Sequence, residues 1–260
     1  MNPLYDQIGL NYDITRKADP EIARRLYEHL QVFDVRPIVD IACGTGNYTI
    51  ALQRLGLNVT GVDISLEMLK SAQGKSNSID WVQSNVENLP FENDYFSGAT
   101  CILAIHHFRD LKSSFEEIYR VIKRGSRLVI FTATAEQMNH YWLNVYFPNM
   151  MRNSIQQMPT EDQIKISLQD AGFTLLGFET FLVEPNLEDF FLYSGKFRPE
   201  MYLNEKVRSG ISSFTSLADP AEINTGLHQL TQDLQTGEIM RKIKDYPSIK
   251  GDYMYVIVEK

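Results

Sequence analysis

The sequence predicts a doubly wound α/β fold built on a mostly parallel sheet of seven strands. Between residues 38 and 134, short apolar runs alternate with stretches in which apolar residues recur at helical spacing. The apolar runs are continuous, as expected for parallel strands that are covered by helices on both faces. A tight turn, "CGTGN" at 43–47, follows the first run, and glycine turns after strands bring the backbone close to a ligand.

Strands and helices alternate in order along this part of the chain. The first helix is predicted at 20–33, where Pro20 suits the first turn and Phe33 is the last apolar residue of the periodic face. Ser65 and Thr160 are candidate caps for two later helices. The predicted strands are "PIVDIA" (37–42), "NVTGVDIS" (58–65), one that shares "IDWVQSNVENLPF" (79–91) with a polar loop, "FSGATCILAIHHF" (96–108), "RLVIFTAT" (127–134), "TLLGFETFLVE" (174–184) and "DYMYVIVEK" (252–260). The later helices are predicted at 48–56, 66–73, 113–125 and 160–173.

The chain is expected to form a single domain, 1–260, with a helical segment inserted before the last strand. A structureless loop as long as 185–250 is rare in compact domains, so this segment is predicted to fold as a helical cap. The expected parts are an N-terminal helical lid (1–35), the core (36–184 and 251–260) and the cap (185–250). The last strand should then pair with the strand at 174–183.

Aromatic residues before and within the predicted cap are candidates for the lining of a pocket. For one cluster, a pocket and the apolar face of a cap helix are equally compatible with the sequence. That cluster contains Tyr141, Trp142, Tyr146 and Phe147. In the cap, the pocket-lining residues are expected among Phe191, Tyr193, Phe197 and Tyr202.

The composition limits the classes of partner. The chain has 260 residues and a formal net charge of -8, and no Lys/Arg run is longer than two adjacent residues. A nucleic-acid partner is therefore not expected, because such proteins carry a basic stripe. The start "MNPLYDQIGLNYD" has no signal-peptide apolar region, and no apolar run has the ~20 residues of a membrane helix. The expected location is cytoplasmic, with no membrane partner. Two cysteines, Cys43 and Cys101, form neither a disulfide framework nor a zinc pattern.

Three ligands are possible at the glycine turn. A P-loop is excluded because no Lys follows the turn. A dinucleotide site normally has a third glycine where this chain has Thr49, which disfavours NAD without excluding it. The third possibility starts from Asp63, whose carboxylate can accept the hydroxyls of a ribose, and from Asn85, which is available to an adenine edge. A ribose and an adenine without a pyrophosphate site fit S-adenosylmethionine.

At these residues the sequence resembles the class I S-adenosylmethionine-dependent methyltransferases, in the broad small-molecule group called type 11. Four stretches carry the resemblance in the right order, and they span roughly 36–134. They are "VDIACGTGNYT", "VTGVDIS", "NVENLPFENDYFSGATCILAIHHF" and "EEIYRVIKRGSRLVIFT". The resemblance implies a Rossmann-like sheet, S-adenosylmethionine as cofactor and methyl transfer to a small-molecule acceptor.

The resemblance also implies roles for single residues. The first motif would lie against the methionine half of the cofactor, and it contains Asp40, Ala42, Gly44 and Gly46. The ribose and adenine contacts would come from Asp63, Ile64, Asn85 and Val86. Many relatives carry Asp at the position of Asn85, but Asn still offers an acceptor to the adenine amino group. Ala104 would lie where cofactor and acceptor meet.

Two further groups of residues are assigned to the site. Tyr12 and Arg16 precede the first strand, and similar proteins fold this segment over the cofactor, so Arg16 is expected to pair with the methionine carboxylate. His106 and His107 end the fourth predicted strand, where they should face opposite sides and one could act as a base. No metal site is expected, and the protein should be a monomer or homodimer. The alternative functions are a catalytically silent cofactor-binding protein and an NAD-dependent oxidoreductase.

Overall fold

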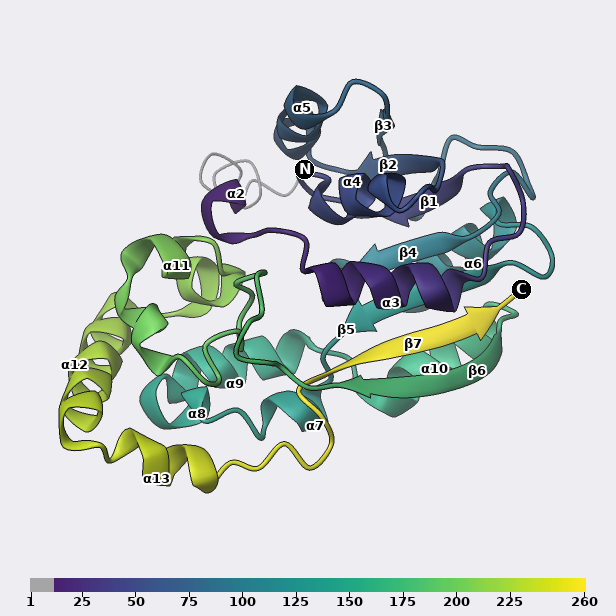
Figure 1. The fold of residues 1–260 in the computed structure, drawn as a ribbon. Helices are drawn as coiled ribbons and strands as arrows, with labels where there is room; N and C mark the ends of the chain where they lie inside the picture. The colour runs from purple at the N-terminus through teal and green to yellow at the C-terminus, as the bar shows by residue number, and fades with distance from the viewer. Residues whose placement is uncertain (1–11) are drawn as a thin grey trace.

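The computed structural model describes residues 12–260, and in this part of the chain it contains one sheet of seven strands. The strand order is β3-β2-β1-β4-β5-β7-β6, and only β7 runs antiparallel to its neighbours (Figure 1). This order confirms the predicted fold class and the pairing of the last strand with the strand that starts at Thr174. The strands are β1 (Ile38–Ile41), β2 (Val59–Asp63), β3 (Asp80–Gln83), β4 (Ala99–Ile102), β5 (Arg127–Thr132), β6 (Thr174–Phe181) and β7 (Tyr253–Glu259).

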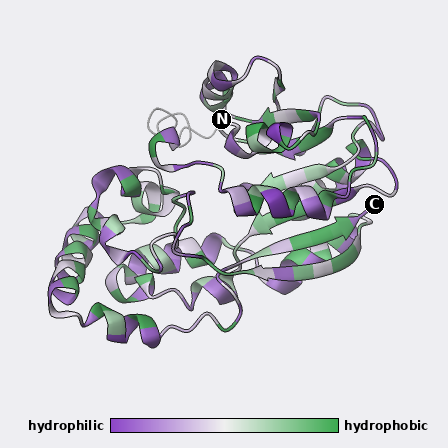
Figure 2. Ribbon diagram, in the orientation of Figure 1, coloured by the Kyte–Doolittle hydropathy of each residue, from purple (hydrophilic) through white to green (hydrophobic). Residues whose placement is uncertain are grey.

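The central strands lie between two hydrophobic layers. Ile38 of β1 and Phe131 of β5 belong to one core cluster, whereas their neighbours Val39 and Ile130 belong to the cluster on the opposite face. Because both faces are covered, every residue of β1 is buried, including Asp40 among its three apolar residues. Figure 2 shows the sheet as predominantly hydrophobic and the helices as alternating between hydrophilic and hydrophobic residues.

The helices that cover the sheet begin where the sequence predicts them. The Ser65 side chain accepts a hydrogen bond from the Met68 N–H and caps α5, and Thr160 forms a capping box with Gln163 at the start of α10. Gly172 takes a positive φ of 101° just after α10 ends. The covering helices are α3 (Pro20–Leu30), α4 (Asn47–Arg54), α5 (Leu66–Lys75), α6 (Leu111–Val121) and α10 (Glu161–Asp170).

The predicted end of the first helix is wrong. Helix α3 stops at Leu30 because Gln31 adopts the left-handed conformation with φ 45°. Phe33 therefore leaves the apolar face of the helix, and it is 93% exposed. The apolar spacing extended past the end of the helix only by coincidence.

Helices from two separate segments form a second layer at one end of the sheet, here called the helical layer. Figure 1 shows α7, α8 and α9, which precede α10, beside α11, α12 and α13, which precede β7. The predicted cap, 185–250, is thus helical, but it shares its layer with residues from 135–157. The members are α7 (Ala135–Met138), α8 (Leu143–Tyr146), α9 (Pro148–Gln157), a 3-10 turn (Pro199–Leu203), α11 (Glu205–Ser209), a π-helical turn (Ser213–Leu217), α12 (Pro220–Thr236) and α13 (Ile239–Lys244).

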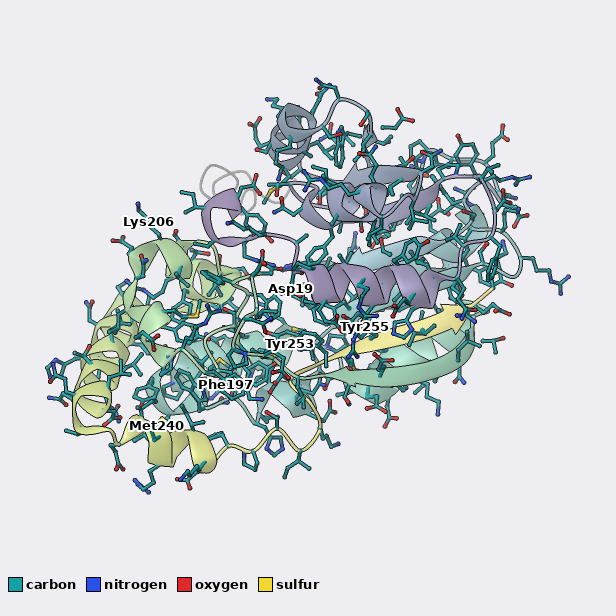
Figure 3. The ribbon with its side chains drawn as sticks, in the orientation of Figure 1. Asp19, Phe197, Lys206, Met240, Tyr253 and Tyr255 are labelled. Carbon is teal, nitrogen blue, oxygen red and sulfur yellow. The ribbon has the colours of Figure 1, made fainter. Side chains whose placement is uncertain are left out.

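Aromatic packing joins the helical layer to the sheet. The rings of Tyr141 and Tyr193 stack with centroids 3.9 Å apart, and Trp142 meets Tyr202 edge to face. In Figure 3, Tyr253 lies where β7 meets the layer, while Lys206 and Met240 lie toward its outer side. The layer is therefore continuous with the core of the domain. Among the described residues, no helix is both long and apolar enough to cross a membrane.

Candidate functional site

The glycine turn between β1 and α4 is held in place by Asp63 at the end of β2. One oxygen of Asp63 accepts a hydrogen bond from the Gly44 N–H, at 2.8 Å, and the other accepts from the Ser65 N–H, at 2.8 Å. Gly44 and Gly46 both have positive φ, 56° and 76°, a conformation that glycine adopts most readily. A Cβ on Gly46 would overlap the ring of Trp81, whereas a Cβ on Gly44 would meet nothing within 4 Å. Gly44 therefore faces open space.

That space is a depression here called the glycine cleft. Its floor includes Asp40, whose two carboxylate oxygens accept hydrogen bonds from Thr49, at 2.6 Å, and Thr100, at 2.8 Å. Burial raises the pKa of Asp40 to about 6, although the two hydroxyls oppose this shift. The residues that line the glycine cleft are Tyr12, Arg16, Lys17, Asp40, Ala42, Cys43, Gly44, Thr45, Asn47, Tyr48, Ile102 and Asp189.

A second depression, the strand-end cleft, lies at the carboxyl ends of the neighbouring strands. It brings together all four residues that the sequence assigned to a ribose and an adenine, Asp63, Ile64, Asn85 and Val86. The side-chain Oδ1 of Asn85 accepts a hydrogen bond from the Glu87 N–H and so fixes the loop after β3. The cleft is also lined by Ile41, Ala42, Val62, Ser84, Glu87, His107, Phe108 and Arg109.

The third depression, the inner cavity, lies between the ends of the strands and the helical layer. Its wall is largely apolar, with hydroxyl, amide and imidazole groups interspersed. Its lining residues are Tyr12, Arg16, Leu103, His106, His107, Ala133, Met138, Ser154, Gln157, Met158, Phe191, Leu192, Gly210, Ile211, Ser212, Ser213, Leu217 and Tyr253.

The three depressions adjoin one another because they share lining residues. Ala42 lines both the glycine cleft and the strand-end cleft. Tyr12 and Arg16 line both the glycine cleft and the inner cavity, and His107 lines both the strand-end cleft and the inner cavity. A ligand that fills both clefts would therefore meet a second ligand in the inner cavity.

The predicted extended conformation of the histidine pair is wrong. Strand β4 ends at Ile102, and Ile105–His107 form a 3-10 turn in which the two imidazole rings lie 3.9 Å apart. The turn points both side chains into the inner cavity instead of placing them on opposite sides of a strand. No hydrogen-bond partner for Nδ1 of His106 exists among the described residues. Burial lowers the pKa of both imidazoles, that of His107 to about 4, so both are neutral at pH 7.

Ala104 is buried behind this turn. It is 5% exposed, its carbonyl accepts a hydrogen bond from the His107 N–H, and it lines none of the three depressions. Its part in the site is therefore to hold the histidine turn, and the expected direct contact with a ligand is not supported by the geometry.

The N-terminal segment lies over the glycine turn as expected. Helix α2 (Tyr12–Thr15) is tied to the turn by Asp13, which accepts hydrogen bonds from Thr45, at 2.6 Å, and Asn47, at 3.0 Å. Arg16 lines the cleft, but its guanidinium is already paired with a carboxylate, that of Asp189. The first part of the predicted lid, residues 1–11, lies outside the described residues.

Sequence reasoning missed Asp189, and of the four aromatic candidates in the insertion it could not tell which one lines the cavity. Asp189 lies in "NLEDFF", which matches no motif, and it enters the cleft only through a contact with the distant Arg16. Of the aromatic candidates, Phe191 alone lines the inner cavity. The other candidates either are buried in the core or, for Phe197, are 49% exposed. The cluster before the insertion, Tyr141, Trp142, Tyr146 and Phe147, is core as well.

Comparisons with known proteins identify the family. A family model described as a methyltransferase domain matches residues 39–130. A solved structure from Anabaena variabilis, described as a methyltransferase of an antibiotic biosynthesis pathway, is 33% identical with a TM-score of 0.83, and the alignment covers 95% of this chain and 99% of that one. The chain belongs to the class I S-adenosylmethionine-dependent methyltransferases. Its cofactor is S-adenosylmethionine.

Two further relatives show how broad this family is. A demethylmenaquinone methyltransferase from Paenarthrobacter aurescens is 26% identical over 196 residues, which are 66% of this chain and 77% of that protein. A geranyl diphosphate C-methyltransferase from Streptomyces coelicolor, solved with S-adenosyl-L-homocysteine and Mg²⁺, is 14% identical with a TM-score of 0.57, covering 92% of this chain and 78% of that one. The second likeness shows the methyltransferase fold alone.

Proposed function

We propose that this methyltransferase transfers the methyl group of S-adenosylmethionine to a small, largely apolar molecule bound in the inner cavity. The observation that carries the proposal is the junction of the three depressions at Ala42, Tyr12, Arg16 and His107. The cofactor supplies an activated methyl group on a sulfonium, so the protein mainly has to align an acceptor with it. A junction between the two clefts that would hold the cofactor and the inner cavity provides that alignment.

The residues of the two clefts fit the cofactor. Gly44 leaves its Cβ position open, so a ligand can approach the backbone closely there. Asp63 lies at the edge of the strand-end cleft, where its carboxylate can accept ribose hydroxyls, and Asn85 and Val86 lie farther along as the adenine contacts. In the glycine cleft, Arg16 offers a cation to the methionine carboxylate.

The lining of the inner cavity indicates the chemistry of the acceptor. Arg16 is the one charged side chain that lines the cavity among the described residues, and it also lines the glycine cleft, where we assign it to the methionine carboxylate. A phosphate or diphosphate would therefore find no free positive partner in this wall. The neutral imidazoles of His106 and His107 can take a proton from a hydroxyl or an acidic carbon. We therefore propose an uncharged acceptor that carries such a group, for example a phenol or a quinol.

The experiment that tests this function measures cofactor binding and methyl transfer separately. Calorimetry should show binding of S-adenosylhomocysteine and none of NAD. Methyl-labelled cofactor, incubated with a panel of phenols, quinols and their phosphate esters, should label the uncharged compounds. Phe191→Ala, in the cavity wall, should change the acceptor KM, whereas Phe197→Ala, in the same segment but outside the wall, should not.

A second candidate function is a catalytically silent cofactor-binding protein. The shape of the inner cavity alone would also fit this function. Binding of S-adenosylhomocysteine without label transfer to any compound of the panel or of a small-molecule extract would favour it. The family membership removes the NAD-dependent oxidoreductase from the alternatives. We keep as proposals a monomer or homodimer, a cytoplasmic location and the lack of a nucleic-acid partner, which the net charge of -8 supports.

A further inference from the structure

A buried ion pair forms one wall of the glycine cleft. Arg16 Nε donates to Oδ1 of Asp189 at 2.6 Å, and Nη2 donates to Oδ2 at 3.3 Å. The side chains are 13% and 1% exposed. The Tyr48 hydroxyl donates to the same carboxylate at 3.1 Å. Asp189 thus joins the insertion before β7 to Arg16, which follows α2, and to Tyr48 of α4.

Burial of an ion pair does not by itself indicate a ligand. The pair of Lys196 and Asp252 is equally buried, with side chains 13% and 1% exposed, and it has a clear structural task. Asp252 accepts hydrogen bonds from the Val183 N–H and from Ser248, and it thereby fixes the start of β7. Neither member of that pair lines the glycine cleft, whereas Arg16 and Asp189 both do.

The Arg16–Asp189 pair lines the cleft and keeps unused hydrogen-bonding capacity. A carboxylate can accept about four hydrogen bonds, and three reach Asp189 from Arg16 and Tyr48. Nη1 of Arg16 donates to none of the described residues, although Nε and Nη2 do. Since a buried ion pair is often no more stable than an apolar substitute, a pair with unused capacity at a cleft points to recognition.

The two other carboxylates near the cleft, Asp40 and Asp13, are less suited to bind an ammonium, and the remaining charged lining residue, Lys17, is a cation. Both oxygens of Asp40 are held by threonine hydroxyls, and burial raises its pKa to about 6. Asp13 is occupied by Thr45, Asn47 and Lys75. The pair at the cleft therefore presents one anion and one cation side by side, which is the pattern complementary to a zwitterionic α-amino acid.

We propose that Asp189 binds the ammonium of the cofactor's methionine head while its partner Arg16 binds the carboxylate. This inference rests on the proposed function, because it places the methionine half of S-adenosylmethionine in the glycine cleft. It adds a cofactor-binding residue from the insertion to the residues of the first motif. The same segment that encloses the inner cavity then also recognises the cofactor.

Four ligands separate the two charges in a calorimetric test. S-adenosylhomocysteine carries both groups, and 5′-methylthioadenosine carries neither. An amine-only analogue, S-adenosyl-3-thiopropylamine, and the corresponding deaminated acid carry one each. For the wild-type protein, each one-group analogue should bind more tightly than methylthioadenosine, by roughly ten-fold for a charge-assisted contact. An amine-only analogue that binds no better than methylthioadenosine overturns the role of Asp189 without any variant.

Variants then assign each charge to its residue. Asp189→Asn should weaken S-adenosylhomocysteine and the amine-only analogue by about ten-fold and leave methylthioadenosine unchanged. Arg16→Gln should weaken S-adenosylhomocysteine and the acid-only analogue instead. Asp252→Asn is the matched control, because it breaks an equally buried pair outside the cleft, so the affinity ratios should stay as in the wild type. An equal loss for all four ligands in Asp189→Asn would show that Asp189 is only structural.

The proposed function and this inference fail in different ways. A wild-type protein that does not bind S-adenosylhomocysteine contradicts the proposed function itself. A different result contradicts only the role of Asp189. In that case the wild type binds S-adenosylhomocysteine, and Asp189→Asn has the same ratio of affinities for S-adenosylhomocysteine and methylthioadenosine as the wild type. If Asp189→Asn does not fold, the wild-type comparison of the four ligands still decides.

Discussion

The carboxylate of Asp63 and the backbone N–H of Gly44 form a 2.8 Å hydrogen bond that joins the end of β2 to the turn after β1. Asp63 is 8% exposed and lines the strand-end cleft, while Gly44 lines the glycine cleft. One side chain therefore fixes the relative position of the two clefts that we assign to a single ligand. This contact makes the strand-end cleft and the glycine turn a single unit.

Replacement of Asp63 by Ala should weaken the binding of S-adenosylhomocysteine by roughly 1.5–3 kcal/mol, the usual value for hydrogen bonds to a charged group. The ribose hydroxyls would lose their acceptor, and the Gly44 N–H would lose its partner. Calorimetry measures the change. Asp80→Ala, at an exposed position on the adjacent strand β3, is the control and should bind as the wild type does. An unchanged affinity for Asp63→Ala would contradict the assignment of this cleft.

The two glycines of the turn should respond differently to substitution by Ala. Gly44→Ala places a Cβ in open space at φ 56°, so it should cost about 1–2 kcal/mol of stability. The new methyl would project into the glycine cleft, so the affinity for S-adenosylhomocysteine should fall strongly. Gly46→Ala should cost more stability, because its Cβ overlaps Trp81 in addition to the strain at φ 76°. Urea unfolding and calorimetry on both variants compare the two effects, and a smaller stability loss for Gly46→Ala would contradict this geometry.

The stability that Asp40 contributes should decrease as the pH rises. Its pKa in the folded protein, about 6, lies above the ordinary value of 3.8, so its neutral form is favoured by folding. This contribution is complete below pH 3.8 and is lost as the pH rises through 6. Asp40→Asn mimics the neutral form, so the free energy of unfolding of this variant relative to wild type should rise between pH 5 and pH 7.5, by on the order of 1–3 kcal/mol.

Thr100→Val provides the matched comparison for Asp40. It removes one of the two hydroxyls that stabilise the Asp40 carboxylate, so it should destabilise the protein more at pH 7.5 than at pH 5. Urea unfolding at both pH values gives all the free energies. A pH-independent difference for both variants would show that Asp40 does not titrate with a raised pKa.

Most of the sheet and the glycine turn could be predicted because their signals are local. Strands β1 and β5 are largely buried on both faces, and the sequence shows this because apolar residues stand at adjacent positions instead of alternating with polar ones. Ser65 and Thr160 cap helices through contacts within three residues, so their role is encoded in the neighbouring sequence. Asp63 could also be predicted from its neighbours, because it is the polar residue that directly follows the apolar end of the second strand.

The features that could not be predicted depend on contacts between distant segments. Asp189 becomes part of the cleft because residue 16 lies beside it, and no local pattern indicates a contact over 173 positions. Phe191 and Tyr193 are two residues apart in an irregular segment, so no periodicity shows which of them faces the cavity. The histidine turn was missed because "AIHHF" continues the apolar run of the fourth strand in the sequence, whereas β4 itself ends earlier, at Ile102.

The histidine pair should supply the proton acceptor for methyl transfer to a hydroxyl or an acidic carbon. Both imidazoles line the inner cavity, and their lowered pKa values keep them neutral, and therefore able to accept a proton, at pH 7. General-base catalysis contributes about 10²–10⁴-fold, and a base with a pKa near 4 should lie toward the lower end because it is weak. His106→Gln or His107→Gln should therefore reduce kcat about 100-fold for the acceptor that the panel identifies.

The two histidine variants should differ in cofactor binding, and the pH dependence of the wild-type kcat/KM should report the neutral base. His107 also lines the strand-end cleft, so His107→Gln should weaken S-adenosylhomocysteine, whereas His106→Gln should bind it as the wild type does. Because the neutral form is the active one, kcat/KM of the wild type should rise with pH through about 4 and stay level between pH 6 and 8. His228→Gln, exposed on α12, controls for a general effect of the substitution. If both cavity variants kept kcat within about two-fold, far below the usual effect of losing a base, the acceptor would need none and the pair would only shape the wall.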